Sequence, residues 1–367
     1  MMSTIRSVHC RRNTRFISLA GVAVTVAAIA GPACAGSNGE VLLPLQVSTV
    51  PGNGDLNPYG LAVVPKGFPG ERLTQGQRLV SNFNNAANSQ GMGSTIISVD
   101  PTSGQTGLFF QGAPPIGFTN ALSIAKAGFV FAGSVFTTDG STGQAGPLFV
   151  FNQDGRQVAQ FAQSDKINGP WGMAIHDQGK TAQLFVSNVF DGTITRLDVS
   201  LQNGTFTVIG SPVTIASGYA FGPDPTAVVV GPAGLAYDST NDILYVAAEG
   251  DNAIFALAGA AKTTTDLGRG TLVFADSTLL HGPLGLILAP NGNLITANAD
   301  PSTITSTAGP SEIVEFTPAG QFVRTFSIDS APGSAFAINV VTKGNVKQFS
   351  YVDDAQATLT ILRLAPE

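Results

Sequence analysis

Six copies of one short motif recur along this chain, and no other feature constrains the fold as strongly. The clearest copies read Gly-Pro-x-Gly followed by a short apolar run. The copies are NPYGLAV from Asn57, FTNALSI from Phe118, GPWGMAI from Gly169, GPAGLAY from Gly231, GPLGLIL from Gly282 and GSAFAIN from Gly333. Their small residues, 50 to 62 positions apart, are Gly60, Ala121, Gly172, Gly234, Gly285 and Ala335. A period of this length is typical of a repeat architecture with one supersecondary unit per copy.

Each copy is followed by further β-type runs, such as AQLFVSNVFDGTITRLDV and DILYVAAEGDNAIFALA. A full unit therefore reads as strand, turn, strand, loop, strand, and TPAGQFVRTFSI is an example of a fourth strand. The strands are apolar on both faces, as expected for small sheets packed between two neighbours. The prediction is an all-β, six-bladed β-propeller of four-stranded blades. Its blades are expected at residues 57–116, 117–167, 168–229, 230–280, 281–331 and 332–365, the last completed by 41–50.

The motif glycines have a structural explanation in such a ring. The innermost strands converge near the axis, where glycine or alanine fits and a larger side chain does not. The last blade has only three strands after its motif, so VLLPLQVSTV at 41–50 is expected to add its outer strand and close the ring. Closure of this kind also removes exposed sheet edges near the termini.

The first 35 residues have the pattern of an export signal. Four arginines precede the uncharged stretch FISLAGVAVTVAAIAG, and the small-residue site ACA stands before Gly36. The pair Arg11-Arg12 suggests export by the twin-arginine route, and Cys34 suggests a lipidation site. Ordinary cleavage after Ala35 is favoured over both. The sequence thus predicts an exported protein, periplasmic or secreted, without an integral membrane segment in the mature chain.

Composition narrows the function classes. Both cysteines, Cys10 and Cys34, lie in the signal, so the mature chain is expected to have no disulfide and no thiol nucleophile. Four of the 18 basic residues lie there too, which shifts the formal net charge from −6 to about −10. The remaining lysines and arginines are scattered, and this disfavours nucleic acid as a partner.

The runs LYVAAEGDNAIFAL and LFVSNVFDGTITRLD, each preceded by the Gly-Pro motif, resemble NHL-type repeats and the gluconolactonase-like propellers, including lactonases and lyases. The resemblance implies a six-bladed ring with a site at the mouth of its central funnel. In the lactonases an Asp of a Pro-Asp-Gly motif binds metal, and in the lyases a His precedes the motif glycine. The equivalent positions here are Tyr59, Asn120, Trp171, Ala233, Leu284 and Ser334, so neither set is reproduced. His281, in LLHGPLG, stands close by but out of register.

Polar residues follow the second strands, on the face expected to hold the Gly-Pro turns. The equivalent positions are Asn82, Gly133, Asn188, Ala248, Asn298 and Asp353. Nearby are Asn84, Asn85, Asp191, Glu249, Asp251, Asn252, Asp300 and Asp354. Amides beside an aromatic suit a polar organic ligand or sugar, and oxygen donors suit a divalent cation such as Ca²⁺. The alternative is that Asn and Asp bond their own turns and that Trp171 plugs the funnel.

The predicted ligand-binding residues are Tyr59, Asn82, Asn120, Trp171, Asn188, Glu249, Asn298 and Asp353, and the metal candidates are Glu249, Asp251, Asp300 and Asp353. The leading interpretation is a binding or scaffold module that takes a small polar ligand, a sugar or a protein partner at the mouth. The alternatives are a metal-assisted hydrolase or lyase, with His281 as its catalytic candidate, and a purely structural protein. Long polar loops at 134–147 and 299–311 are expected at the mouth rim, and 65–77 at the opposite end.

Overall fold

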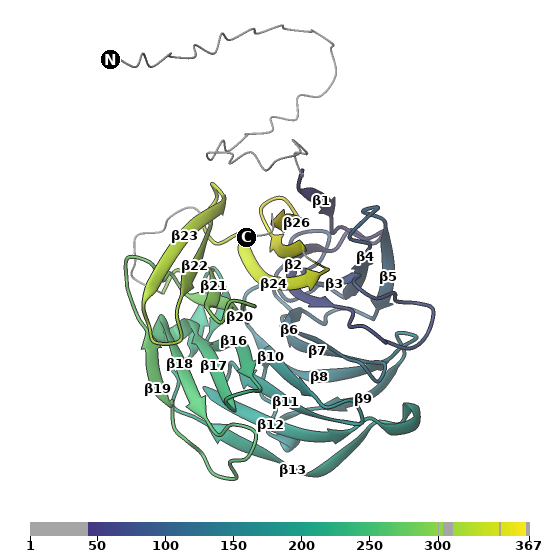
Figure 1. Cartoon of the computed structure of the whole chain (residues 1–367). Coiled ribbons are helices and arrows are strands. Elements are labelled where there is room, and N and C mark those ends of the chain that lie inside the picture. The colour runs from purple at the N-terminus through teal and green to yellow at the C-terminus, as the bar shows by residue number, and fades with distance from the viewer. Residues whose placement is uncertain (1–42, 300, 304–310, 345, 365–367) are drawn as a thin grey trace, which may run out of the picture. The chain divides into compact units, whose positions relative to one another are not determined.

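The computed structural model describes residues 43–299, 301–303, 311–344 and 346–364. They form a ring of six antiparallel four-stranded sheets, and the chain passes around the ring in sequence order (Figure 1). The predicted all-β, six-bladed propeller is therefore confirmed. Within the part of the chain that is described, no helix is long and apolar enough to cross a membrane.

The blades follow one another along the chain, each written here from its inner to its outer strand. The first blade consists of β2 (Leu56–Val63), β3 (Arg78–Asn84), β4 (Thr95–Val99) and β5 (Thr106–Gln111). The second consists of β6 (Phe118–Ala125), β7 (Phe129–Phe136), β8 (Gln144–Asn152) and β9 (Gln157–Phe161). The third consists of β10 (Pro170–Asp177), β11 (Thr181–Asn188), β12 (Thr193–Ser200) and β13 (Thr207–Ala216). The fourth blade consists of β16 (Pro232–Asp238), β17 (Ile243–Ala248), β18 (Ala253–Ala258) and β19 (Thr271–Phe274). The fifth consists of β20 (Pro283–Leu288), β21 (Leu294–Asn298), β22 (Ser311–Phe316) and β23 (Phe322–Asp329). The sixth consists of β24 (Ala335–Lys343), β25 (Val346–Asp353), β26 (Thr358–Leu364) and β1 (Leu45–Ser48).

Outside the blades, a two-stranded hairpin follows the third blade. It consists of β14 (Gly222–Asp224) and β15 (Val228–Val230). Three short 3₁₀ turns complete the described elements: η1 (Gln163–Asp165), η2 (Gln202–Gly204) and η3 (Glu249–Asp251). The sequence did not predict the hairpin.

The N-terminal strand closes the ring. β1 is the outer strand of the sixth blade and pairs antiparallel with β26, with Val47 opposite Leu359. In Figure 1 the purple β1 and the yellow β26 lie side by side. The predicted closure, with the first described strand added to the last blade, is confirmed.

The motif glycines lie where neighbouring blades meet at the axis. A Cβ added to Gly172 would overlap the carbonyl oxygen of Ala233 in the next blade, and one added to Gly234 would overlap that of Leu284. A hydroxyl group bridges the first of these junctions, because Ser187 Oγ donates to the Ala233 carbonyl at 2.7 Å. Backbone crowding between blades therefore selects glycine here.

Two copies of the motif depart from the predicted register. In the sixth blade Ala335 pairs with Asp353 as Pro283 pairs with Asn298 in the fifth. Phe336 therefore occupies the position predicted for Ser334. In the second blade, three residues instead of two separate the corresponding paired positions, which inserts a bulge at Thr119–Ala121.

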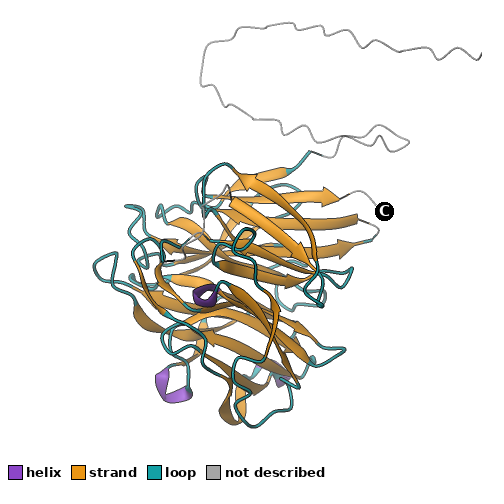
Figure 2. Cartoon of the chain, turned by 90° about the vertical axis from the view of Figure 1, so that its left-hand side faces the viewer, coloured by secondary structure: helices purple, strands orange, loops and turns teal. Residues whose placement is uncertain are grey.

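Neighbouring blades pack face to face, as the side view in Figure 2 shows. The layer between the first and second blades, for example, buries Leu79, Phe109, Phe118 and Phe151. Similar apolar clusters lie between other blades. This packing makes the ring a rigid frame for the loops at its two ends.

Candidate functional site

An aromatic cluster fills the central channel at the end of the ring that carries the Gly-Pro turns, here called the mouth. Tyr59 stacks on Phe336 with ring centroids 4.4 Å apart and meets Trp171 edge-on at 5.4 Å. Phe83 lies against both Tyr59 and Trp171. Trp171 is 0 % exposed, so its indole plugs the channel and offers no accessible ligand platform.

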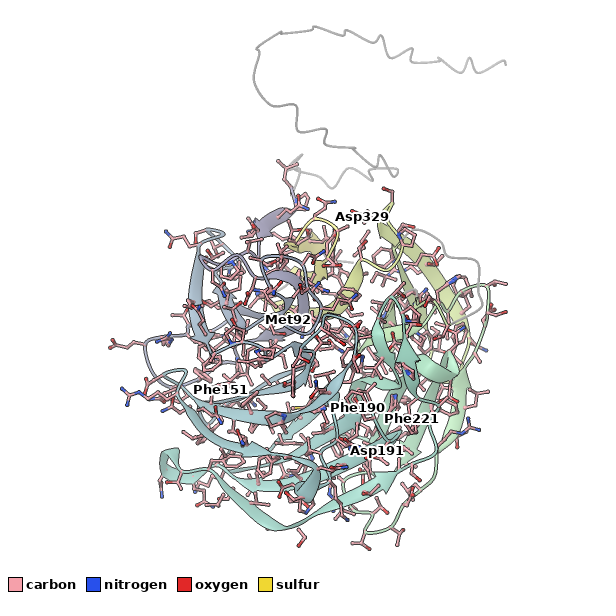
Figure 3. The ribbon with its side chains drawn as sticks, turned by 180° about the vertical axis from the view of Figure 1, so that it is seen from behind. Met92, Phe151, Phe190, Asp191, Phe221 and Asp329 are labelled. Atoms are coloured by element: carbon pink, nitrogen blue, oxygen red, sulfur yellow. The ribbon has the colours of Figure 1, made fainter. Side chains whose placement is uncertain are left out.

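The hairpin of β14 and β15, here called the mouth hairpin, packs on this aromatic cluster. Val228 and Val229 are buried in the same apolar core as Tyr59 and Trp171. Val228 has a φ of 68°, a conformation that a β-branched residue adopts only under constraint from its surroundings. Figure 3 labels Phe190 and Asp191, which lie between β11 and β12, and Phe221, which directly precedes the mouth hairpin.

Asp224 fastens the mouth hairpin to the fifth blade. Its carboxylate accepts from Thr303 Oγ1 at 2.7 Å and from Ser302 Oγ at 3.0 Å, as well as from Thr226 in its own turn. Burial by itself would raise the pKa of Asp224, but these hydrogen bonds outweigh it and hold the pKa well below the usual range. On the other side, Gln90 Nε2 of the first blade donates to the Thr226 carbonyl at 2.8 Å. The hairpin is thus anchored to two distant blades.

Glu249 lies in this plug with its carboxyl group entirely buried. Both carboxyl oxygens and the Trp171 Nε1–H lack a hydrogen-bond partner among the residues described. Burial, and then the charge of Asp224, raises the pKa of Glu249 far above its usual value, and the nearby indole of Trp171 opposes the shift.

Three of the predicted amide residues are buried and bonded to their own blades. Asn188 accepts from the backbone N–H of Asn168 and donates to the Lys166 carbonyl. Asn298 accepts from the backbone N–H of His281, and Asn82 donates to the Thr49 carbonyl and to Thr95. These side chains fasten the segments that lead into the blades. None of the three lines a described cavity.

Two carboxyl groups at the end of β25 have raised pKa values. Burial raises the pKa of Asp354 to about 6, and burial together with the charge of Asp329 raises that of Asp353 to about 7. Asp353 accepts from the backbone N–H of Gln356 and does not line a described cavity. Asp354 does line one, between the first and sixth blades.

That cavity, here called the mouth pocket, has a volume of about 330 Å³. Aromatic walls come from Tyr59, Phe83 and Phe336, and the turn of the mouth hairpin contributes Thr226 and Ala227. Its remaining lining residues are Asn57, Asn84, Asn88, Gln90, Ala299, Pro332, Gly333 and Asp354.

Two asparagines that line the mouth pocket each have an amide oxygen without a partner. Asn57 Oδ1 and Asn84 Oδ1 are buried and accept no hydrogen bond from the described part of the protein. The Asn84 amide nitrogen donates to Asn88 Oδ1 at 2.8 Å, so Asn84 Oδ1 is the end of the Asn84 amide that lacks a partner among the described residues. Asn57 has a φ of 58°, the left-handed conformation that an asparagine tolerates better than most residues. Buried acceptors without partners are costly, and they mark where a donor fits.

The other predicted residues lie apart from this pocket. Asn120 lines a cavity at the opposite end of the ring, because the bulge in the second blade displaces it. His281 is buried, and its Nε2 lies 3.8 Å from Glu312 Oε2. Asp251 forms an ion pair with Arg269 at 2.9 Å. Asp300 is outside the described residues, and the part of the chain that is described contains no group of three or more His, Cys, Asp or Glu arranged to hold a metal ion.

Comparison with known proteins gives structural neighbours only. No family model matches the sequence, and no curated protein matches it. A calcium-binding protein, regucalcin, from Agrobacterium tumefaciens superposes with a TM-score of 0.52 at 11% identity, over 84% of this chain and 90% of that one. A luciferin-regenerating enzyme superposes with a TM-score of 0.51 at 10% identity, over 87% and 94%. At these identities the likenesses support the propeller fold alone.

Proposed function

We propose that this protein is an exported binding module that holds a small polyhydroxylated ligand, such as a sugar, in the mouth pocket. The observation that carries the proposal is that Asn57 and Asn84, two residues that line the cavity, each have a buried amide oxygen without a partner in the described part of the protein. A ligand with several hydroxyl donors would satisfy both. Because leaving a buried acceptor unpaired costs roughly 1–3 kcal/mol, binding would recover free energy that the empty site lacks.

The remaining walls suit the same chemistry. Tyr59 and Phe336 present aromatic surface for the apolar face of a sugar ring, and Asp354 adds a carboxylate that accepts hydrogen bonds when ionised. With a pKa of about 6, that carboxylate is mostly ionised at pH 7.5. Asn57, Asn84 and Asp354 each bring an acceptor oxygen to the lining, which favours a ligand that donates.

Calorimetric titration of mono- and disaccharides, with Ca²⁺ as a separate arm, tests the proposal. At least one sugar is expected to bind the wild type, and Asn84→Ala is expected to weaken binding about tenfold by removing one acceptor. The matched control is Asn241→Ala, an exposed asparagine in the β16–β17 turn, which should leave affinity unchanged. Binding of Ca²⁺ alone, or sugar binding insensitive to Asn84→Ala, would refute the proposal.

The second candidate, a hydrolase or lyase, depends on His281. That residue lies against Glu312 and lines none of the described cavities, so no observation favours it over binding. Ester or lactone turnover that disappears in His281→Ala would nevertheless replace the binding proposal with this one.

Export belongs to the same proposal. The arginines and the uncharged stretch before Ala35 support it, and the predicted cleavage leaves Gly36 as the first residue. Fractionation of the source cells with N-terminal sequencing of the mature chain tests it. A cytoplasmic protein that retains residues 1–35 would contradict it.

A further inference from the structure

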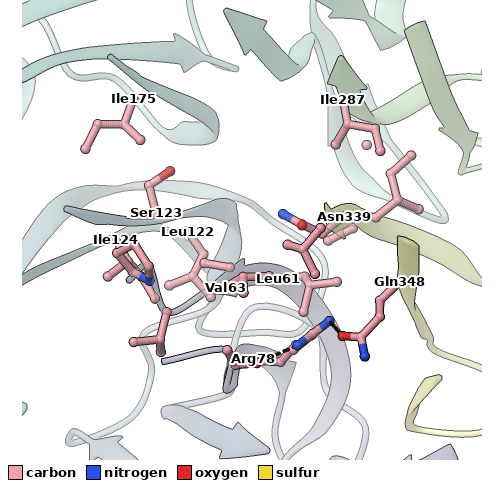
Figure 4. A pocket seen from close by; sticks show the side chains of 18 of the residues that line it. Leu61, Val63, Arg78, Leu122, Ser123, Ile124, Ile175, Ile287, Asn339 and Gln348 are labelled. Atoms are coloured by element: carbon pink, nitrogen blue, oxygen red, sulfur yellow. Dashed lines mark hydrogen bonds between the residues drawn. The ribbon is translucent and has the colours of Figure 1, made fainter. Parts of the chain in front are cut away.

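A second, larger cavity opens at the end of the ring opposite the mouth. This distal cavity has a volume of about 870 Å³ (Figure 4). Each blade contributes at least one apolar residue from its inner strand, and six of these residues follow directly after the motif positions. These residues are Leu61, Leu122, Met173, Leu235, Leu286 and Ile338. The volume is within the range of pockets that enclose small organic ligands.

The charge of the distal cavity is opposite to that of the protein. Among the described residues, its only charged lining residues are Lys66 and Arg78, and no described carboxylate lines it. The whole chain, by contrast, has 24 acidic and 18 basic residues. A basic apolar cavity in an acidic protein points to an anionic ligand with an apolar body.

Arg78 is the more informative of the two cations because it is 1 % exposed. Its Nη2 donates to Gln348 Oε1 at 2.9 Å, its Nη1 to the Gly76 carbonyl, and its Nε to Ser350 Oγ at 3.4 Å. Figure 4 shows the guanidinium reaching Gln348 at the edge of the apolar wall.

All of these acceptors are neutral. No ion pair joins Arg78 to any residue that the structure describes. Burial lowers the pKa of Arg78 only to about 10, so the group is cationic at pH 7. A buried charge without a counterion is strongly destabilising, which leaves a place for an anion beside it.

We infer that the distal cavity binds a small amphipathic carboxylate, with its anionic head at Arg78 and its hydrocarbon body among the inner-strand aliphatic residues. A guanidinium binds a carboxylate through parallel N–H donors. The neutral acceptors around Arg78 do not supply this charged pairing. Lys66, exposed at the rim, adds attraction for the entering anion. This site is separate from the mouth pocket and does not depend on the function proposed there.

Calorimetric titration with octanoate, 1-octanol and octylamine at pH 7.5 tests the inference. Octanoate is expected to bind about ten- to a hundredfold more tightly than octanol, because a hydrogen bond between charged groups adds roughly 1.5–3 kcal/mol. Octylamine is expected not to bind. Equal affinity for octanoate and octanol, tighter binding of the amine, or no binding of any probe would overturn the inference.

Variants locate the site independently of folding defects. Arg78→Met should reduce octanoate affinity to that of octanol, and Arg78→Lys should retain part of the difference. If Arg78→Met does not fold, Ile175→Trp fills the cavity, leaves Arg78 untouched and should abolish octanoate binding. The control Asp354→Asn alters only the mouth pocket and should leave octanoate affinity unchanged. Octanoate binding that persists in Ile175→Trp, or is lost in Asp354→Asn, would contradict the assignment.

Discussion

Thr303 Oγ1 donates to the Asp224 carboxylate at 2.7 Å across 79 positions of sequence, and this contact joins the mouth hairpin to the fifth blade. Ser302 and Thr226 donate to the same carboxylate. The mouth hairpin therefore covers part of the mouth, and Asp224 fastens it to the fifth blade.

Asp224→Ala is expected to loosen the mouth hairpin while the blades stay folded. Hydrogen exchange of the amides in 222–230 should accelerate about tenfold or more, since each lost hydrogen bond to a charged group is worth roughly 1.5–3 kcal/mol. The control is Asp139→Ala, which removes an exposed carboxylate that caps only its own turn through Ser141 and Thr142. Unchanged exchange in Asp224→Ala would show that apolar packing and the Gln90 contact hold the hairpin without Asp224.

Glu249 should make the protein less stable as the pH rises. Because the pKa of Glu249 is raised in the folded state, the native protein holds a proton that the unfolded chain loses above its ordinary pKa near 4.5. The free energy of unfolding therefore falls with rising pH until the folded-state pKa is passed. Glu249→Gln should flatten this decline and stabilise the protein by about 1–3 kcal/mol at pH 8.

Urea denaturation at several pH values measures this effect, with Glu71→Gln, an exposed glutamate, as control. Parallel pH profiles for wild type and Glu249→Gln would mean that Glu249 is ionised and paired in the folded protein.

Gly172→Ala should destabilise the ring through a steric clash between blades. The added methyl overlaps the Ala233 carbonyl, so the two inner strands must separate, at a cost of roughly 1–3 kcal/mol. The comparison is Gly52→Ala, where nothing lies within 4 Å of the new methyl. Thermal unfolding of both variants is the measurement, and equal melting temperatures would refute the crowding argument.

Removal of β1 should cost more stability than its four residues suggest. A chain that begins at Val50 leaves β26 as an open edge, with the ladder at Leu45, Gln46, Val47 and Ser48 lost. A chain that begins at Leu43 is the control. We expect a lower melting temperature and concentration-dependent association only in the shorter chain, measured by calorimetry and light scattering. Identical behaviour of the two chains would mean that β1 does not stabilise the ring.

The repeat predicted the blades well because one physical constraint acts at each copy. Gly172 and Gly234 approach the next blade's carbonyl groups, and that crowding leaves a visible trace in the sequence. The register was wrong in the sixth blade because Ala335 and Ala337 are both small, and only the strand pairing shows that Phe336 faces the mouth.

The site was less accessible to sequence reasoning. GPDPTAVVV gives little sign of a hairpin, since β14 and β15 have only three residues each and their role depends on Ser302 and Thr303. Asn84 and Asp354 were noted as neighbours of the predicted ring, but the structure alone shows that they share a cavity with Asn57. Asn188 and Asn298 have the same residue type and yet bond the segments that lead into their blades, a difference that no spacing reveals.

The claim that the mouth pocket binds a sugar is tested most directly by a crystal structure determined after crystals of the protein are soaked with the tightest-binding sugar. The account predicts a ligand in the mouth pocket with hydroxyl groups within hydrogen-bond distance of Asn57 Oδ1 and Asn84 Oδ1, packed against Tyr59. A pocket that contains only water, with the sugar bound elsewhere or not at all, would contradict it.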